Sequence, residues 1–322
     1  MAKNTWEVAV KAIEAHENIF IFHHIRPDGD CLGSQFGLRE LIKTNYPEKN
    51  VFVIGDNGGI FPFLKWDFDN FDSIPKQYLE NSLGVIVDAN NSNRIQFSNI
   101  FVNNFTHKLR IDHHPVDTDI KYDYVWEDAT YAAAAEQVAY IAMMANWKVT
   151  TKAAEYTYLG INTDSGRFQY EYVQQRTFDV MSYLHAGNSF RVWDINFPLS
   201  IRDEQKVRFN AYMLLNYVSD NKVVWFYASK KVQKKFKLNE NSANDVNALA
   251  NIGDSKIWVL FIDQPDGTIR ARVRSNGIWI NHICEKYAPG GGHEVASGAT
   301  CKNKKQMKQL IEDLKAEVQK HA

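Results

Sequence analysis

Residues 24–34 read HIRPDGDCLGS and follow the apolar run NIFIF at residues 18–22. The apolar run predicts a buried strand, and the proline and first glycine after it predict a turn at its carboxyl end. His24, Asp28 and Asp30 all lie in this short stretch. Two carboxylates two positions apart repel each other, which lowers stability unless a cation lies between them. The stretch therefore predicts a strand that ends at a cation-binding site.

Strand-like and helix-like segments alternate through the first half of the chain. The strand-like runs are residues 18–24, 50–56, 82–90 and 108–114, and helix-period segments occupy residues 34–46 and 131–146. Such alternation favours βαβ units, so the fold class is α/β with a mostly parallel, doubly wound sheet. The pattern continues to about residue 187, which predicts an N-terminal domain at residues 1–187.

The pattern changes in the second half of the chain. Residues 188–220 are interpreted as a connector followed by a helix, and residues 221–322 as a smaller α+β domain. Strand-like runs at 221–229, 256–263 and 268–276 and a helical segment at 244–252 lead to a terminal helix at 302–320. The terminal helix is expected to bury one apolar stripe, made of Met307, Leu310, Ile311, Leu314 and Val318.

Composition limits the classes of function. The 322 residues include 45% hydrophobic and 23% charged residues and carry a net charge of −1, which indicates a globular protein without a basic field for long nucleic acids. No apolar run is long enough to span a membrane, and the N-terminal residues form a charged amphipathic pattern, so we expect a cytoplasmic protein. The three cysteines lack zinc-site spacing, and Cys31 is interpreted as a small buried filler.

Acidic and imidazole residues follow several predicted strands. His24, Asp28 and Asp30 follow the first run, Asp88 follows another, and Asp112, His113 and His114 follow a third, while Asp164 follows the helix-like residues 151–161. Each motif alone is weak, because such residues are also common in solvated loops and at capped strand ends. Ligands of open α/β sheets bind beyond the carboxyl ends of the strands, where these side chains could meet. Four acids and two histidines supply enough ligands for two divalent cations.

Six motifs in order carry a resemblance to a known family. The stretches HIRPDGDCLGS, VDANNSNR, RIDHHP, NTDSGRF, RVRSNG and PGGGHEVASGA resemble those of the DHH/DHHA1 phosphoesterases, and most of all the nanoRNase branch. The resemblance covers nearly the whole chain. It implies a DHH domain at 1–187 and a DHHA1 domain at 221–322, with the active site in a cleft between them.

The resemblance also implies a ligand set for two Mn²⁺ ions, with Mg²⁺ as a substitute. One ion would be held by His24, Asp28 and Asp88, and the other by Asp30, Asp88, His113 and Asp164, so that Asp88 bridges. A metal separation of about 3.5–4 Å would let one hydroxide bridge both ions and attack phosphorus. Asp112 is expected to orient a neighbouring imidazole, and His114 to contact a phosphate oxygen or protonate the leaving oxygen.

A second group of residues is expected to bind the substrate. Arginine forms two hydrogen bonds to a phosphate, and glycine N–H groups approach a phosphate closely, although a glycine run is more often just a flexible turn. Most aromatic residues of this chain must be core, but Phe168 is the best candidate to stack a base. The expected substrate-binding residues are Arg274, Ser275, Gly290, Gly291, Gly292, His293, Arg94 and Phe168.

The function implied by the resemblance is hydrolysis of short RNA to mononucleotides and dephosphorylation of adenosine 3',5'-bisphosphate, called pAp. A protein that binds the terminal phosphate of its substrate and has no long basic channel is suited to short substrates. Three alternatives remain open, namely a phosphodiesterase for cyclic or linear dinucleotides such as pApA, a pyrophosphatase, and a catalytically silent nucleotide-binding regulator. A homodimer also remains open. Pro289, where many relatives have a fourth glycine, and the Asn-rich residues 90–93 put the substrate range in doubt.

Overall fold

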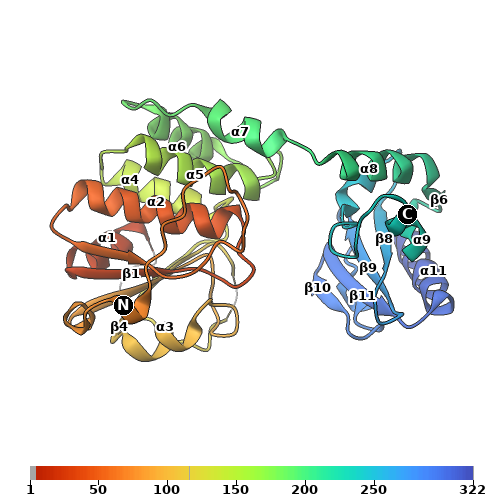
Figure 1. The fold of residues 1–322 in the computed structure, drawn as a ribbon, viewed down its shortest axis with the longest axis horizontal. Coiled ribbons are helices and arrows are strands. Elements are labelled where there is room, and N and C mark those ends of the chain that lie inside the picture. Colours follow the sequence, from red (N-terminus) through yellow and green to blue (C-terminus); the bar gives the residue numbers. More distant parts are fainter. Residues whose placement is uncertain (1–4, 116, 322) are drawn as a thin grey trace. The chain divides into compact units, whose positions relative to one another are not determined.

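The chain folds as two compact units, residues 1–200 and 201–322, each with one sheet and its own core (Figure 1). The structure is a computed structural model that describes residues 5–115 and 117–321. The domain boundaries expected at residues 187 and 221 stay predictions. Within the described residues, no helix is both long and apolar enough to cross a membrane.

The first unit contains a five-stranded, all-parallel sheet in the order β2-β1-β3-β4-β5, which confirms the predicted parallel sheet. Its strands are β1 (Asn18–Phe22), β2 (Asn50–Val53), β3 (Ser82–Val87), β4 (His107–Asp112) and β5 (Tyr124–Glu127). The chain passes from β1 to the edge strand β2 and then returns to pair β3 with the other side of β1. The strand order therefore reverses between β1 and β3, and such a switch point is where open α/β sheets bind ligands.

Helices cover both faces of this sheet. The α-helices are α1 (Trp6–Glu14), α2 (Gly29–Asn45), α3 (Ser98–Asn104), α4 (Ala134–Met144), α5 (Thr151–Asp164), α6 (Gln175–His185) and α7 (Val192–Ser200). Two short 3₁₀ helices, Phe71–Ser73 and Lys76–Leu79, precede β3. In β1, Ile19 and Ile21 pack with α1, α2, α4 and α5, while Phe20 and Phe22 pack on the opposite face with Phe101 of α3. Burial on both faces is the reason that β1 is a continuous apolar run.

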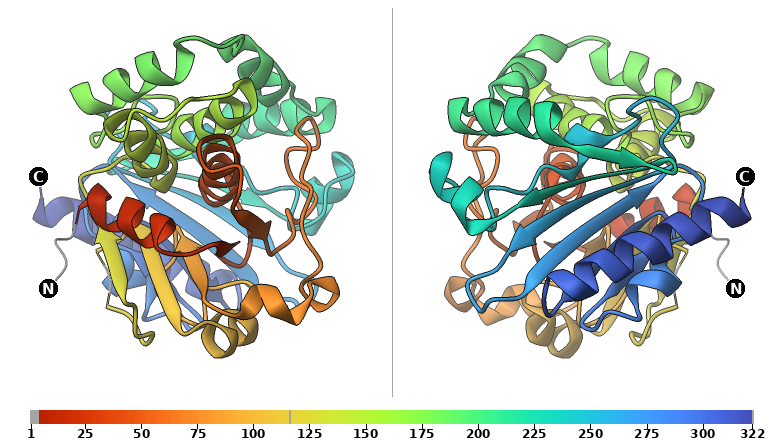
Figure 2. Two further views of the ribbon diagram at one scale, coloured as in Figure 1. Left: turned by 90° about the vertical axis from the view of Figure 1, so that its left-hand side faces the viewer. Right: turned by 90° about the vertical axis from the view of Figure 1, so that its right-hand side faces the viewer.

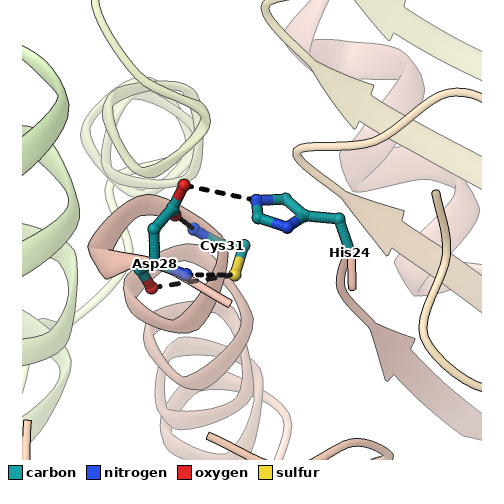
Figure 3. Close-up of side chains that lie close together, drawn as sticks. All are labelled: His24, Asp28 and Cys31. Atoms are coloured by element: carbon teal, nitrogen blue, oxygen red, sulfur yellow. Dashed lines mark hydrogen bonds and ion pairs between the residues drawn. The ribbon is translucent and has the colours of Figure 1, made fainter. Parts of the chain in front are cut away.

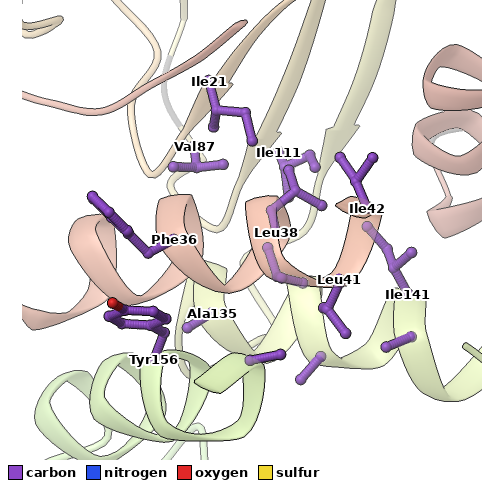
Figure 4. Close-up of a cluster of buried hydrophobic side chains, with 14 of the residues drawn as sticks. Ile21, Phe36, Leu38, Leu41, Ile42, Val87, Ile111, Ala135, Ile141 and Tyr156 are labelled. Atoms are coloured by element: carbon purple, nitrogen blue, oxygen red, sulfur yellow. The ribbon is translucent and has the colours of Figure 1, made fainter. Parts of the chain in front are cut away.

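Helix α2 lies at the centre of the first unit. Figure 4 shows it between the strands on one side and α4 and α5 on the other, with Phe36 and Leu38 among the buried side chains. Gly33 lets α2 and α5 approach closely, since a Cβ atom there would lie 2.5 Å from the backbone oxygen of Tyr156 and 2.8 Å from the backbone nitrogen of Gly160. This contact brings the N-terminal turn of α2 beside the C-terminal half of α5.

The second unit contains a six-stranded mixed sheet in the order β10-β11-β9-β8-β7-β6. Its strands are β6 (Val218–Asp220), β7 (Val223–Ala228), β8 (Ile257–Asp263), β9 (Ile269–Ser275), β10 (Gly291–His293) and β11 (Ala296–Cys301). The β7–β8 pair is parallel and the other neighbouring pairs are antiparallel. The predicted α+β organisation of this half is confirmed. The glycine run, interpreted from sequence as a loop, instead contributes to edge strand β10.

Helices cover the second sheet unequally. The unit contains α8 (Glu204–Asn216), α9 (Lys230–Lys235), α10 (Asn281–Cys284) and α11 (Lys304–Lys320), and a 3₁₀ helix at Val246–Leu249 where the sequence predicted a longer helical segment. Helix α11 lies across one face of the sheet (Figure 2, right) and buries the predicted apolar stripe from Met307 to Val318. On the opposite face, α8 and the 3₁₀ helix pack over β7 and β8. None of the described residues of β9, β10 and β11 belongs to that second core.

Candidate active site

The six predicted metal ligands lie together at the carboxyl ends of the first sheet. His24 follows β1 and Asp88 follows β3, so they meet at the switch point, and His24 Nε2 lies 3.4 Å from Asp28 Oδ2 and 3.3 Å from Asp88 Oδ2. His113 follows β4. Its Nε2 atom lies 3.7 Å from Asp30 Oδ2, 3.5 Å from Asp88 Oδ1 and 3.5 Å from Asp164 Oδ2.

Both histidines present the same nitrogen to the carboxylates. His24 Nδ1 donates to the backbone oxygen of Ile25 (2.8 Å), and His113 Nδ1 donates to the backbone oxygen of Tyr131 (3.2 Å). These bonds fix the ring orientation and leave Nε2 of each ring facing the cluster. Histidines that bind metals are commonly held in this way through their second nitrogen.

The two aspartates of the PDGD turn also cap helices. Asp28 Oδ1 accepts from the backbone N–H groups of Asp30 (3.0 Å) and Cys31 (3.1 Å), so Asp28 is the N-cap of α2. The carboxylate of Asp30 accepts from the N–H groups of Ala134 (2.7 Å) and Ala135 (2.8 Å), which start α4. Helix N-termini stabilise negative charge, which offsets part of the repulsion between these carboxylates. No local sequence pattern predicts the link from Asp30 to α4.

Asp88 occupies the centre of the cluster in a strained backbone conformation. Its φ angle is +56°, in the left-handed region, where residues other than glycine are uncommon. The side chain is buried, and its Oδ1 atom has no hydrogen-bond partner among the described residues. The imidazole nitrogens of His113 and His114 approach it to 3.5 and 3.4 Å, and a buried carboxylate oxygen that accepts no hydrogen bond is suited to a cation.

The charged groups of the cluster shift one another's pKa values. Burial raises the pKa of Asp30 well above its ordinary value, and Asp88 and Asp164 raise it further. Burial likewise raises the pKa of Asp164 to about 6. Although burial alone would lower it, the pKa of His113 is raised to about 10 by these three carboxylates. Metal binding would therefore release protons from this site.

The donor set fits divalent cations. Three groups bring their ligand atoms within 4.8 Å of one another, namely Asp88–His113–His114, Asp30–His113–Asp164 and His24–Asp28–Cys31. Mixed carboxylate and imidazole ligands suit ions such as Mn²⁺, whereas Mg²⁺ prefers a site made only of oxygen ligands. The orphaned Asp88 oxygen and the two oriented imidazoles are consistent with such ions.

Cys31 belongs to the helix cap beside the cluster. Figure 3 shows the His24 ring pointing toward the Asp28 carboxylate, with Cys31 in the first turn of α2. The Cys31 sulfur accepts from the N–H group of Asp28 (3.3 Å), and burial raises the pKa of this thiol to about 12. A fully buried, protonated thiol agrees with its interpretation as a small filler.

Asp112 and His114 form a pair at the end of β4. His114 Nδ1 donates to Asp112 Oδ1 (2.8 Å), and the N–H group of His114 donates to the same oxygen (3.1 Å). Asp112 Oδ2 accepts two bonds from Arg110, at 3.1 and 2.7 Å. Sequence reasoning missed Arg110, although its position two residues before Asp112 on one strand places both on the same face.

The two substrate-binding candidates of the first unit differ in their surroundings. The carbonyl oxygen of Arg94 accepts from the N–H group of Ile25 (2.6 Å), which fixes Arg94 beside the His24 segment. The Phe168 ring is half-buried and stacks on Phe178, with ring centroids 6.1 Å apart and planes at 27°. Phe168 therefore makes core contacts, and its role in base stacking stays a prediction.

The candidates of the second unit lie in neighbouring strands. Arg274 of β9 pairs with Ala296 of β11, which pairs with His293 of β10, so Arg274 and His293 lie in one row across the sheet. The Ser275 hydroxyl donates to the backbone oxygen of Ile278 and is used within the fold. Residues 290–292 lead into and form β10, and a Cβ atom at the first of them would lie 2.0 Å from the backbone oxygen of Cys284.

Two family models match the two halves of the chain. The model described as "DHH family, N-terminal domain" matches residues 18–161, and the model described as "DHHA1 domain" matches residues 220–320. A curated relative from Mycoplasma pneumoniae (strain ATCC 29342 / M129 / Subtype 1) is 42% identical over 311 residues, which is 96% of this chain and 95% of the relative. The chain belongs to the DHH family. That DHH-family relative is named "Bifunctional oligoribonuclease and PAP phosphatase NrnA".

Other DHH-family proteins extend the likeness. A Bacillus subtilis (strain 168) relative with the same name is 30% identical over 326 residues, covering 97% of this chain and 98% of the relative. Among solved structures, an exopolyphosphatase-related protein from Bacteroides fragilis matches with a TM-score of 0.84 at 24% identity. The match covers 98% of this chain and 97% of that structure, and at this identity it supports the fold alone.

Proposed function

We propose that this phosphoesterase cleaves short oligoribonucleotides to mononucleotides and dephosphorylates pAp, with two Mn²⁺ ions as cofactors. The observation that carries the proposal is the clustering of six ligand side chains around the buried carboxylate of Asp88, whose Oδ1 atom accepts no hydrogen bond from the described residues. The names of the DHH-family relatives support the substrate class.

The six side chains divide into two ligand sets that share Asp88. One set is His24, Asp28 and Asp88, and the other is Asp30, Asp88, His113 and Asp164. When bound, the two ions supply Lewis acidity toward a phosphoryl group and lower the pKa of water. The protein's part is to fix the ligands: the backbone bonds to both imidazoles and the helix caps hold four of them in place.

His114 is the group that we expect to contact the scissile phosphate or the leaving oxygen. Its Nδ1 atom is held by Asp112, so Nε2 is the ring nitrogen left to donate a hydrogen bond or a proton. Arg110 in turn fixes the Asp112 carboxylate through two bonds. Asp112 is thus a positioning residue for His114. In the second unit, Arg274 and His293 would bind a substrate phosphate.

Replacing Asp112 by asparagine is expected to lower kcat on pApA about ten- to a hundredfold, because an amide cannot accept from both Arg110 and His114. Leaving the buried Arg110 guanidinium with one partner fewer should also lower the free energy of unfolding by about 3 kcal/mol. Steady-state kinetics and urea unfolding check both values. If the role is positioning, the Asp112→Asn and His114→Asn changes combined cost little more than His114→Asn alone. Additive losses would contradict it.

A hydrolysis panel tests the function directly. With Mn²⁺ present we expect hydrolysis of pAp and pApA, and rates that fall steeply as RNA length increases from two nucleotides to twenty. Removal of divalent ions by EDTA should abolish activity, and added Mn²⁺ should restore more activity than added Mg²⁺. Faster degradation of long strands than of dimers to pentamers would contradict the proposal. Cleavage of pApA without pAp would indicate a dinucleotide phosphodiesterase instead.

A further inference from the structure

The segment 130–135, between β5 and the first turn of α4, contacts two of the proposed metal ligands through its backbone. The carbonyl oxygen of Tyr131 accepts from His113 Nδ1 (3.2 Å). The N–H groups of the first two residues of α4 donate to the Asp30 carboxylate at 2.7 and 2.8 Å. The positions of both ligand side chains therefore depend on the path that this segment follows.

The last four residues of the segment cannot fix that path with their own side chains. Residues 132–135 are all alanines, which have no polar side-chain atom. Ala133 is the N-cap of α4, a position where a residue such as serine or aspartate usually accepts a backbone hydrogen bond. Other groups must therefore fix the backbone of this segment.

Glu136 supplies the first such contacts, from the first turn of α4. Its side chain is fully buried, and Oε2 accepts from the N–H group of Ala132 (2.7 Å). The other oxygen, Oε1, accepts from the Thr177 hydroxyl (2.9 Å) and from Arg176 Nε (3.2 Å), both at the start of α6. A glutamate in the first turn that reaches back to a preceding N–H group resembles one half of a capping box. Glu136 thus fixes where the chain enters α4.

Arg176 supplies further contacts from α6, which packs against α4 (Figure 1). Its guanidinium carbon lies 3.4 Å from the centroid of the Tyr131 ring, and Nη2 donates to the backbone oxygen of Thr130 (2.6 Å). The Arg176 side chain is only 22% exposed, so solvent screens its ion pair with Glu136 weakly. A planar guanidinium can stack on a ring and bond to a carboxylate at the same time, which an ammonium group cannot do.

We propose that Glu136 and Arg176 are positioning residues for Asp30 and His113, and that they act through the backbone of segment 130–135. This inference rests on the function proposed above and deepens it, because both ligands belong to one of the two proposed ligand sets. Among the described residues, neither Glu136 nor Arg176 forms a hydrogen bond or ion pair with a proposed ligand. Their effect on metal binding is therefore indirect, and groups that orient metal ligands typically contribute about ten- to a hundredfold to affinity.

The test measures the Mn²⁺ affinity of full-length Arg176→Lys by titration without substrate. Lysine keeps the positive charge beside Glu136 but loses the stacked plane and the bond to Thr130, so we expect Kd for Mn²⁺ to rise about tenfold. At saturating Mn²⁺, kcat on pApA should return to within about threefold of the parent value, because the ligands themselves are unchanged. Glu136→Gln should raise Kd about a hundredfold, since it also leaves the Arg176 guanidinium without its anion.

Arg191→Lys is the matched control. Arg191 also donates two bonds to a carboxylate in the first unit, that of Asp194, but this pair is exposed and does not contact segment 130–135. Its replacement should leave Kd for Mn²⁺ unchanged. Amide hydrogen exchange of the metal-free proteins adds a second measurement. Exchange in residues 130–136 should be about tenfold faster in Arg176→Lys than in the parent, and exchange in α2 should be unchanged.

An unchanged Kd for Mn²⁺ in Arg176→Lys would overturn the inference. If its melting temperature fell at the same time, Arg176 would only stabilise the fold, and if residues 130–136 exchanged faster, the segment would not position the ligands. A loss of kcat that saturating Mn²⁺ does not restore would contradict the inference as well. A parent enzyme that binds Mn²⁺ but hydrolyses neither pAp nor pApA would refute the proposed function alone, and the comparison of Kd values would still decide the role of Arg176.

Discussion

Replacing Asp88 by asparagine is expected to lower kcat for pApA hydrolysis by at least about a thousandfold. Asp88 is the one carboxylate in the described cluster that contacts both His24 and His113, so it belongs to both proposed ligand sets. An amide keeps the shape but carries no charge and cannot bridge two cations. The variant should retain at most one Mn²⁺ ion, and the loss of the shared ligand removes several kcal/mol of transition-state stabilisation.

Asparagine is the right replacement at this position. Asp88 has φ +56°, and asparagine adopts the left-handed region far more readily than alanine does. The loss of activity can then be assigned to the missing charge and not to a misfolded strand end. Asp30→Ala would be a poorer test, because Asp30 accepts two N–H groups at the start of α4 and its removal also uncaps that helix.

The measurement pairs kinetics with a count of bound metal. Steady-state kcat on pApA, manganese stoichiometry after gel filtration, and circular dichroism are compared for the parent and Asp88→Asn. Asp67→Asn, which changes an exposed carboxylate paired with Lys65, serves as the matched control and should leave all three values unchanged. Two retained ions together with near-normal kcat would show that Asp88 does not bridge, and the ligand assignment would be wrong.

The parts of the fold that could be predicted are those with a strong local pattern. Strands β1 and β3 are apolar runs because both of their faces are buried, and the terminal helix shows its stripe of buried residues plainly. Strand β5 (Tyr124–Glu127) was not predicted, since it is short and only Trp126 in it is buried. Strand β10 was interpreted as a loop, because a glycine run gives no strand pattern and its pairing with β11 is a tertiary contact.

The candidate site was predictable where acidic residues or histidines directly follow a predicted strand. Acids and imidazoles after apolar runs located the six ligands, because parallel strands share one carboxyl edge. The contacts that hold those ligands could not be predicted. Asp30 caps a helix that begins 104 residues later, and Asp164 was expected after a helix but is the last residue of α5.

Replacing Gly33 by alanine is expected to destabilise the first unit by about 3 kcal/mol, although alanine is the better helix former by about 1 kcal/mol. The added Cβ atom would lie 2.5 Å from the backbone oxygen of Tyr156 and 2.8 Å from the backbone nitrogen of Gly160. Both contacts are with the backbone of α5, so they cannot be relieved by a side-chain rotation. The helices must separate instead.

Separation of α2 and α5 should also weaken metal binding. Asp30 lies three residues before Gly33 in α2, and Asp164 lies four residues after Gly160 at the end of α5. A shift of about 1 Å between these carboxylates should lower Mn²⁺ affinity and kcat by about a hundredfold. Urea unfolding followed by fluorescence and a manganese titration measure the two effects on the same preparation.

Gly187→Ala separates this effect from ordinary glycine replacement. Gly187 belongs to the same unit, has φ +72°, and no atom lies within 4 Å of an added Cβ. Its replacement should cost about 1 kcal/mol of backbone strain and leave Mn²⁺ affinity unchanged. If Gly33→Ala instead proved as stable as the parent and bound Mn²⁺ equally well, the close approach of the two helices could not be what positions Asp30 and Asp164. The site would then depend on the strand ends alone.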